Sequence, residues 1–548
     1  MGRNTSISAP KTVQTNSADP IVTRLAEEDP VKWWNKPNLR RMYVVLFACC
    51  MGVEITSGFD STLIGTLQMS EAWKAYFSDN YVDPEDGKPE ISPSLLGFVS
   101  ACYQLGSIFG VPIAPYINQT HGRRACVMIG SLIMCVGALL QGFAQHIAMY
   151  IIARMILGFG IVFCIISGSS LLGELGHPKD RPTLTSLFNA SYFIGQIIAS
   201  SIAIPAAEMT SDWGWRMQSL LQICPSLLQI TTIYLLPESP RYLISKDRNE
   251  EALRILVKYH GEGDENSPLV KAEMTQIRET LQLEASTTQK TWLQMIKTKG
   301  MRHRVIVAAF LGLFTQMSGN TLLSYYQDIL YDMMGYTYTY AKTRINVANA
   351  CWSLITATTA AFVVARFKRR TMFMLSAALM CSCFTAMTVA FNRLNAAKLA
   401  GRKNQAAGIA ALFFYFAYAP CYNIGNNALT YTYLIELFPY SQRTHGIGVQ
   451  QVFGKAGGFF SMNVNPPAMD AIGWKFFAIY CGWIAFEVIF IYFMYPETSG
   501  RTLEELAFLF EDPDLAEQAA AAVEHQMHKD VDAKETTLHV DNSPNKMA

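Results

Sequence analysis

The chain has 548 residues, of which 51% are hydrophobic and only 16% are Asp, Glu, Lys or Arg, against about 25% charged residues in an average soluble protein. This composition is too apolar for intrinsic disorder and carries too little charge to cover several soluble domains. The 44 basic and 43 acidic residues nearly cancel, which argues against the concentrated basic face that binds nucleic acid. The twelve cysteines lack the spacing of a zinc site or a disulfide scaffold, and we expect no metal and no cofactor.

Twelve segments have the length of about 20 mostly apolar residues that crossing a membrane requires. They form two sets of six, at 43–67, 95–116, 125–143, 147–172, 184–207 and 220–236, and at 305–330, 347–364, 372–391, 406–429, 446–464 and 476–495. We therefore predict an all-α polytopic membrane protein of two six-helix bundles, at 43–236 and 305–495. The polar stretch 237–304 predicts a linker of short cytosolic helices, between an N-terminal segment (1–42) and a C-terminal tail (496–548).

The basic residues of the short loops fall mainly on one side of the predicted membrane segments. The positive-inside rule assigns that side, with both termini, to the cytosol. One loop dissents, because 392–405 carries Arg393, Lys398, Arg402 and Lys403 on the predicted outside. No set of nucleophile, base and acid converges in a polar part of the sequence, and we expect no enzymatic activity.

The two halves repeat charged motifs in the same order. Glu174 precedes Arg181 by seven residues, and Glu436 precedes Arg443 by the same number. The repeated residues are Gly122, Arg123, Arg124, Glu174, Arg181, Glu238 and Arg241 in the first half, and Arg369, Arg370, Glu436, Arg443, Glu497 and Arg501 in the second. Such a parallel duplication predicts a pseudo-twofold axis along the membrane normal and a solute site between the halves.

These charged residues are expected to act as a gate at the cytosolic helix ends. Carboxylates and arginines would pair when that side is shut and separate when it opens. Each exposed ion pair contributes little free energy, so several weak pairs can favour the shut state and still separate when the halves move. The alternative is that the arginines only anchor the loops by the positive-inside rule.

The ordered motifs resemble those of the sugar porters of the major facilitator superfamily, in particular the fungal hexose and lactose permease-like branch. They read Gly58-Phe-Asp-Ser-Thr-Leu-Ile-Gly65, Gly122-Arg-Arg124, Arg154-Met-Ile-Leu-Gly-Phe-Gly160, Pro237-Glu-Ser-Pro-Arg-Tyr-Leu243, Gln316-Met-Ser-Gly-Asn320, Glu436-Leu-Phe-Pro439 and Pro496-Glu-Thr-Ser-Gly-Arg501. The resemblance implies transport of a sugar such as a hexose or a disaccharide by alternating access, as a proton symport. It also implies a monomer in the lipid bilayer of the plasma membrane.

Both basic loops depart from the family pattern of acid, Arg, any residue, Gly, Arg, Arg. Gln119 and Thr120 replace the acid and the first arginine of the first loop, whereas Ala365 and Lys368 replace the acid and the glycine of the second. These losses weaken both copies of the gate and put fast transport in doubt. They leave open an alternative function, a sugar sensor that binds its solute without turning it over or transports it slowly.

An ionisable residue inside a membrane segment is costly to bury and indicates function. The resemblance implies that Asp60 and Arg154 form the proton-coupling pair. A movement that changes their distance would make Asp60 take up or release a proton. The alternative is a permanent structural ion pair. Glu54 is a competing carboxylate, but at six residues from Asp60 it lies on a different face of the helix.

Amides, hydroxyls and aromatic rings suit an uncharged sugar. Gln316 and Asn320 lie one turn apart, which predicts that they share a face of the seventh segment, with Tyr325 further along. The resemblance implies that three more residues complete the pocket, namely Gln196, Tyr431 and Gln451. For any one of them, hydrogen bonding between helices is an equally good interpretation.

Lys455 and Tyr431 depart from the family, which has an amide and often a tryptophan at these positions. Either the pocket holds a charge or the Lys455 side chain extends to the membrane surface. These differences leave a further alternative open, in which the same fold carries another solute such as a glycoside or a fungal secondary metabolite.

Overall fold

The computed structural model describes residues 25–26, 31–78, 81–82, 89–207, 209, 211–286, 297, 299–363, 367–438 and 443–498. Arg501 and Ala365 lie outside these residues, as do the side chains of Tyr431 and Arg443. Most of the predicted N-terminal segment and of the C-terminal tail also falls outside them.

The described residues are almost entirely helical. The first half contains η1 (Trp33–Asn35), α2 (Pro37–Leu46), η2 (Phe47–Met51), α3 (Gly52–Leu67), α4 (Glu71–Tyr76), α5 (Pro93–Gly110), α6 (Ile113–His121), α7 (Arg123–Gly142), α8 (Ile147–Leu175), α9 (Arg181–Ala190), α10 (Tyr192–Ala207), α11 (Trp213–Leu221) and α12 (Ile223–Ile233). A hairpin of two-residue strands, β1 (Tyr81–Val82) and β2 (Pro89–Glu90), lies between α4 and α5 and pairs Tyr81 with Glu90.

The linker and the second half follow the same pattern. The linker holds α13 (Pro240–Ser245), α14 (Asn249–Tyr259) and α15 (Pro268–Ser286). The second half contains α17 (Lys299–Met317), α18 (Asn320–Tyr325), α19 (Gln327–Met333), α20 (Thr339–Val363), α21 (Arg369–Leu399), α22 (Gln405–Tyr422), η4 (Asn423–Asn427), α23 (Thr430–Leu437), α24 (Arg443–Ile472) and α25 (Lys475–Met494).

Every predicted membrane segment overlaps a helix. Within the described residues, eight helices are long and apolar enough to cross a membrane, or nine if the bent pair α5 and α6 is one span. The remaining predicted segments, 220–236, 347–364 and 446–464, overlap α11 with α12, α20 and α24. They fall below that measure because α11 and α12 are short pieces of one broken segment, and because α20 and α24 carry more polar residues.

Two predicted boundaries are wrong. The segment 305–330 is not one helix, because the chain breaks at Gly319 and again at Tyr326. The segment 392–405 is not a loop throughout, because α21 continues to Leu399 and carries Arg393 and Lys398. The Leu and Ala residues there are strong helix formers, and a lysine in the last turn complements the helix dipole.

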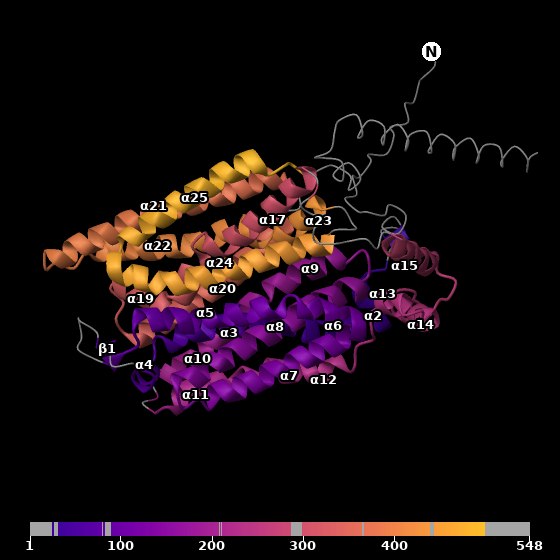
Figure 1. Ribbon diagram of the computed structural model, residues 1–548, viewed down its shortest axis with the longest axis horizontal. Helices are drawn as coiled ribbons and strands as arrows, with labels where there is room; N and C mark the ends of the chain where they lie inside the picture. Colours follow the sequence, from indigo (N-terminus) through magenta and orange to yellow (C-terminus); the bar gives the residue numbers. More distant parts are fainter. Residues whose placement is uncertain are drawn as a thin grey trace, which may run out of the picture.

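Figure 1 shows the helices of the first half in one layer and those of the second half in the other. The linker helices α13, α14 and α15 lie at one end of the first layer, near α2, and we call this end the linker side. The opposite end, which holds α4, β1 and α19, is the far side.

The halves meet along two pairs of helices, since α5 packs against α24 and α10 against α20. A Cβ atom on Gly97 of α5 would lie 2.7 Å from the carbonyl oxygen of Asn463 in α24, so only glycine permits this approach. The far-side part of α3, with Leu63 and Leu67, shares one apolar core with the second half. A separate apolar core fills the linker-side part of the first half. The halves are therefore closed against each other on the far side.

The linker helices are anchored to the first half by charged contacts. Glu262 accepts hydrogen bonds from the backbone N–H groups of Asn38 and Leu39 at the start of α2. Glu273 of α15 contacts His260 Nδ1 at 2.7 Å and Arg181 Nη2 at 3.3 Å. Burial alone would raise the pKa of the Glu273 carboxyl, but the adjacent His260 and Arg181 side chains outweigh it and hold the pKa below its usual value.

Candidate functional site

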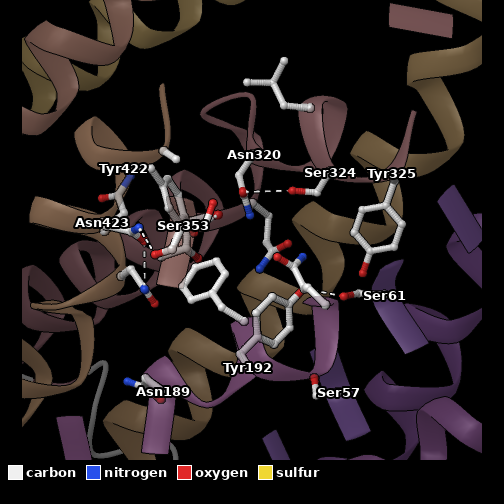
Figure 2. Close-up of a pocket in the computed structure, with 18 of the residues that line it drawn as sticks. Ser57, Ser61, Asn189, Tyr192, Asn320, Ser324, Tyr325, Ser353, Tyr422 and Asn423 are labelled. Atoms are coloured by element: carbon white, nitrogen blue, oxygen red, sulfur yellow. Dashed lines mark hydrogen bonds between the residues drawn. The ribbon is translucent and has the colours of Figure 1, made fainter. Parts of the chain in front are cut away.

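A cavity of about 270 Å³ lies between the two halves. It is lined from both of them. The first half contributes α3, α5, α8, α9 and α10, and the second half contributes α17, α18, α19, α20, α22, η4, α23 and α24. Among the described residues, thirteen of those that line it are asparagine or glutamine, and six are tyrosine. Figure 2 shows some of them, among them Tyr192, Asn320 and Tyr325, around one space. A cavity with so many neutral donors and acceptors and several flat rings can hold a polyhydroxylated solute.

Five of the six residues predicted to bind substrate line this cavity. They are Gln196, Gln316, Asn320, Tyr325 and Gln451. The sixth is Tyr431, whose side chain lies outside the described residues. Their contact with a substrate remains a prediction.

Gln316 and Asn320 do not share a face of one helix, which corrects the prediction. Gly319 between them has φ +98°, in the left-handed region, and ends α17 before α18 begins. A Cβ atom on Gly319 would lie 2.1 Å from Phe384 Cζ. Both side chains still reach the cavity, because they lie on either side of the break.

The broken helix is stabilised by tyrosines of α22. A break inside a membrane leaves backbone carbonyl groups that need donors. The Tyr418 hydroxyl donates to the Ser318 carbonyl oxygen at 3.1 Å, and the Tyr422 hydroxyl donates to that of Thr315 at 2.8 Å. The same two rings line the cavity. The tyrosines therefore fix both the break and the wall of the site.

Several lining residues escaped the sequence analysis. Asn346, Asn349 and Ser353 of α20 line the cavity, as do the asparagines of the π-helical turn η4. The spacing of 346, 349 and 353 is that of one helix face, and the polar run 423–427 interrupts an apolar segment. Both patterns are visible in the sequence and could have indicated these residues. Figure 2 shows Asn423 beside Ser353, whose carbonyl oxygen accepts its hydrogen bond at 3.3 Å.

Asp60 and Arg154 form a fully buried ion pair behind the cavity wall. Asp60 Oδ1 lies 3.4 Å from Arg154 Nη1, and the side chains are 1% and 0% exposed. Within the described residues, Asp60 Oδ2 and two guanidinium nitrogens of Arg154 have no hydrogen-bond partner. The ring of Tyr103, which lines the cavity, lies 5.4 Å from Arg154 Cζ. The pair is thus joined by one long contact in the described part of the chain, and the Tyr103 ring lies against it while also lining the solute space.

Glu487 of α25 is a second buried carboxyl group, and the sequence analysis missed it. It accepts a hydrogen bond from the Ser318 hydroxyl at 2.6 Å and one from the Asn426 amide at 3.5 Å. No basic side chain of the described residues pairs with it. It is fully buried, and Asn426 connects it to the cavity.

On the linker side, the repeated charged motifs make matching contacts in the two halves. Arg123 Nη2 contacts Glu174 at 2.9 Å, and Arg369 Nη2 contacts Glu436 at 3.3 Å. Each pair joins the start of one helix, α7 or α21, to the end of another, α8 or α23. Both pairs lie within one half and are formed while the far side is closed, and a gating role for them remains a prediction.

The Pro-Glu carboxylates bind backbone N–H groups at helix starts, and their predicted pairing with guanidinium groups remains a prediction. Glu238 accepts hydrogen bonds from the backbone N–H groups of Arg123 and Arg124, at 3.2 and 3.3 Å. Glu497 accepts one from Arg369 at 3.0 Å. Both carboxylates thus lie at helix N-termini, where the helix dipole favours negative charge. Gly122 makes room, because a Cβ atom there would lie 2.7 Å from Glu238 Oε2.

Two further arginines of the motifs donate to backbone carbonyl groups, which the sequence did not predict. Arg124 donates to the carbonyl oxygens of Ile233 and Tyr234, and Arg370 to that of Tyr492. Arg181 contacts Glu273 of the linker. Arg241 lines a second cavity on the linker side, of about 310 Å³, with Arg181, Glu174 and Glu273. Near the C-terminal end of a helix, an arginine side chain can donate hydrogen bonds to the carbonyl groups that have no partner within the helix. The sequence motif alone does not reveal these contacts.

On the far side, a charged cluster joins the two halves. Lys74 Nζ of α4 lies 3.0 Å from Asp328 Oδ2 of α19. Lys342 of α20 contacts the same Asp328 and also Asp332, the latter at 2.7 Å. Burial and the charge of Asp328 raise the pKa of the Asp332 carboxyl. The Lys74 contact must break if the halves separate on this side.

A two-bundle helical fold with a polar cavity between the halves and a buried ion pair beside it defines a membrane transporter of the major facilitator type. The sequence matches the family "Sugar (and other) transporter" over residues 44–510. The chain therefore belongs to the sugar porters of this superfamily.

Its relatives include "MFS-type transporter criB" of Aspergillus cristatus, 28% identical over 83% of this chain and 90% of the relative. The "High-affinity glucose transporter" of Kluyveromyces lactis is 25% identical over 87% of this chain and 86% of its own. An inward-open structure of the xylose transporter XylE from E. coli superposes with a TM-score of 0.70 at 20% identity, covering 86% of this chain and all of that one; XylE is described as a proton:xylose symporter. This likeness confirms the predicted fold class.

Proposed function

We propose that the chain carries a sugar across a membrane together with a proton, by alternating access around the central cavity. The observation that carries the proposal is the cavity between the halves, lined by amides and tyrosines, with the Asp60–Arg154 pair directly behind Tyr103. Neutral hydrogen-bonding groups match the hydroxyls of a sugar. The glucose and xylose transporters among the relatives support the same solute class.

Alternating access here is a rocking of the two halves about the α5–α24 and α10–α20 contacts. In the described state the far side is closed by the shared apolar core and by Lys74–Asp328. Solute leaves or enters on the linker side. Opening the far side separates Lys74 from Asp328, and the solute then exchanges with the opposite compartment.

Proton coupling is assigned to Asp60. Its carboxylate has one long contact to Arg154 and one oxygen without a hydrogen bond in the described part of the chain. A shift of Arg154 away from Asp60 leaves a buried carboxylate without its counter-charge, which then binds a proton because an isolated buried charge is costly. Tyr103 transmits solute binding to Arg154, since its ring lies against the guanidinium group.

We place the linker side in the cytosol, because Lys and Arg of the short loops gather there. On this view both termini are cytosolic, the membrane is the plasma membrane, and the chain acts as a monomer. The same proposal includes the predicted division into two bundles at 43–236 and 305–495, joined by a cytosolic linker at 237–304. The linker contacts of Glu262 and Glu273 support a unit that stays attached to the first half while the halves move.

The test is sugar-induced proton uptake by the full chain in proteoliposomes. A potential of 100 mV contributes about 2.3 kcal/mol per proton and one pH unit about 1.4, enough for accumulation of several hundredfold. We expect Asp60→Asn to bind and exchange sugar but to lose accumulation, whereas Asp470→Asn, an exposed carboxylate at the end of α24, should behave like the parent. Full accumulation by Asp60→Asn would refute the coupling assignment, and absence of any sugar binding would refute the sugar proposal.

A further inference from the structure

Two charged side chains face the cavity from opposite halves. Glu54 comes from α3 and Lys455 from α24, and among the described lining residues they are the two that carry charge. Within the described residues, neither makes a hydrogen bond or an ion pair within 4 Å. Each nevertheless acts electrostatically on the other. The cavity thus holds an open pair of opposite charges, separated by a gap.

The gap distinguishes this pair from a structural ion pair. Asp60 and Arg154 are fully buried and in contact, whereas Glu54 and Lys455 are only partly buried and reach the solute space. Charge inside a membrane protein is costly to keep. The thirteen amide side chains already supply the hydrogen-bond donors and acceptors that the hydroxyl groups of a neutral sugar require, so binding such a sugar does not require the two charges.

Lys455 does not extend to the membrane surface. It lies twelve residues into α24, which is about 18 Å along the helix from Arg443. A lysine side chain cannot cover that length, and Lys455 lines the cavity instead. Of the two interpretations that the sequence left open, the structure favours a charge held in the pocket.

We infer that the transported solute is a polyhydroxylated carboxylate, a sugar acid or a glycoside that bears a carboxyl group, with Lys455 binding its carboxylate. This inference rests on the proposed function and narrows its substrate class. The ammonium group of Lys455 can form a charge-assisted hydrogen bond with a solute carboxylate in the cavity. The amides and tyrosines bind the hydroxyls of the same molecule.

Glu54 then couples the anion to a proton. When the solute carboxylate reaches Lys455, two negative groups compete for one cation, and a proton from solution on Glu54 removes the conflict. The empty cavity holds one negative and one positive charge. With solute, it holds neutral Glu54, cationic Lys455 and the anion, so its net charge stays zero through the cycle. The titratable groups that interact with Glu54 are Lys455 and Tyr192 of α10.

The experiment compares two probes that differ only at one carbon, glucose and glucuronate, with the full chain in detergent and in proteoliposomes. We expect glucuronate to bind at least tenfold more tightly than glucose. Lys455→Gln should abolish this preference by weakening the binding of glucuronate, and Lys455→Arg should keep it. Lys475→Gln, an exposed lysine at the start of α25, is the matched control and should change neither probe.

The role of Glu54 is tested by the number of protons taken up per glucuronate. Glu54→Gln should lower this number by one and still bind glucuronate. The inference is overturned if the parent binds glucose as tightly as glucuronate, or if Lys455→Gln weakens both probes equally, as a structural contact between the halves would. Transport of glucose without glucuronate overturns the inference and leaves the proposed function intact, whereas binding of neither probe rejects both.

Discussion

Removing the charge of Lys74 should shift the chain toward a state that is open on the far side. Lys74 belongs to the first half and its partner Asp328 to the second, so the contact exists only while that side is closed. Lys342 holds the same carboxylate from α20, within the second half. The two lysines therefore have the same charge and the same partner, but only Lys74 connects the halves.

The size of the effect follows from burial. An exposed ion pair contributes about 0–1 kcal/mol, and breaking a fully buried one costs about 3–5 kcal/mol. The side chains of Lys74 and Asp328 are 26% and 5% exposed, and Asp328 keeps Lys342 when Lys74 is lost. We expect Lys74→Met to favour the far-side-open state by about 1–2 kcal/mol, which is about 5- to 30-fold in population.

The assay is the labelling rate of Ser61→Cys by a membrane-impermeant thiol reagent applied from the far side. Ser61 lines the cavity, and the far-side contacts now close it off from that direction. The rate should rise about 5- to 30-fold with Lys74→Met, after subtraction of the labelling of the native cysteines. With Lys342→Met it should not rise, because Asp328 then relies on Lys74 alone. An equal rise in both variants would show that the cluster acts on stability and not on the closure between halves.

Three further predictions concern the broken helix, the linker and the buried acid. Gly319→Ala should lower the melting temperature of the purified protein far more than the control Gly335→Ala. Both glycines have a φ in the left-handed region, where an alanine costs about 1–2 kcal/mol. Only at Gly319 would the added Cβ atom also meet another side chain, that of Phe384 at 2.1 Å. Glu273→Gln should speed proteolysis of the linker. In the parent, the stabilising contribution of Glu273 should be present above the ordinary carboxyl pKa and be lost only as the pH falls through its lowered pKa. Glu487→Gln should keep transport near the parent level and Glu487→Ala should lose it, because the carboxyl group is held by hydrogen bonds from Ser318 and Asn426; loss of coupling in the glutamine variant would contradict this.

The sequence predicted the helices well and their interruptions poorly. An apolar run of 26 residues at 305–330 looks like one helix, because hydropathy reports side chains and not backbone bonds. The presence of Gly319 alone does not predict a helix break. The break also depends on Tyr418 and Tyr422 of α22, which donate hydrogen bonds to backbone carbonyl groups beside it. That dependence joins residues about 100 positions apart, which a single sequence does not reveal.

The residues of the site were also predicted only in part. Gln316 and Asn320 were predicted from their motif and Gln196 from the family resemblance, and all three line the cavity. The amides of α20 and η4 were missed, because an asparagine in a membrane helix serves helix packing as readily as ligand binding. Only the arrangement of helices distinguishes the two. Glu54 was set aside because it lies on another helix face than Asp60, and for that reason it faces the cavity while Asp60 is buried behind it.

The two basic loops can lose family residues because the contacts at the helix starts do not depend on those residues. Arg123 and Arg369 keep their glutamates, and neither contact involves Gln119 or Thr120. The loss of glycine at Lys368 also has a physical reason. Gly122 needs φ +93° and a bare Cα so that Glu238 can reach the N–H groups of Arg123 and Arg124, whereas Lys368 has φ −64°, an ordinary value, and Glu497 accepts a hydrogen bond from the Arg369 N–H. The second half therefore reaches the same geometry without the left-handed turn that requires glycine in the first.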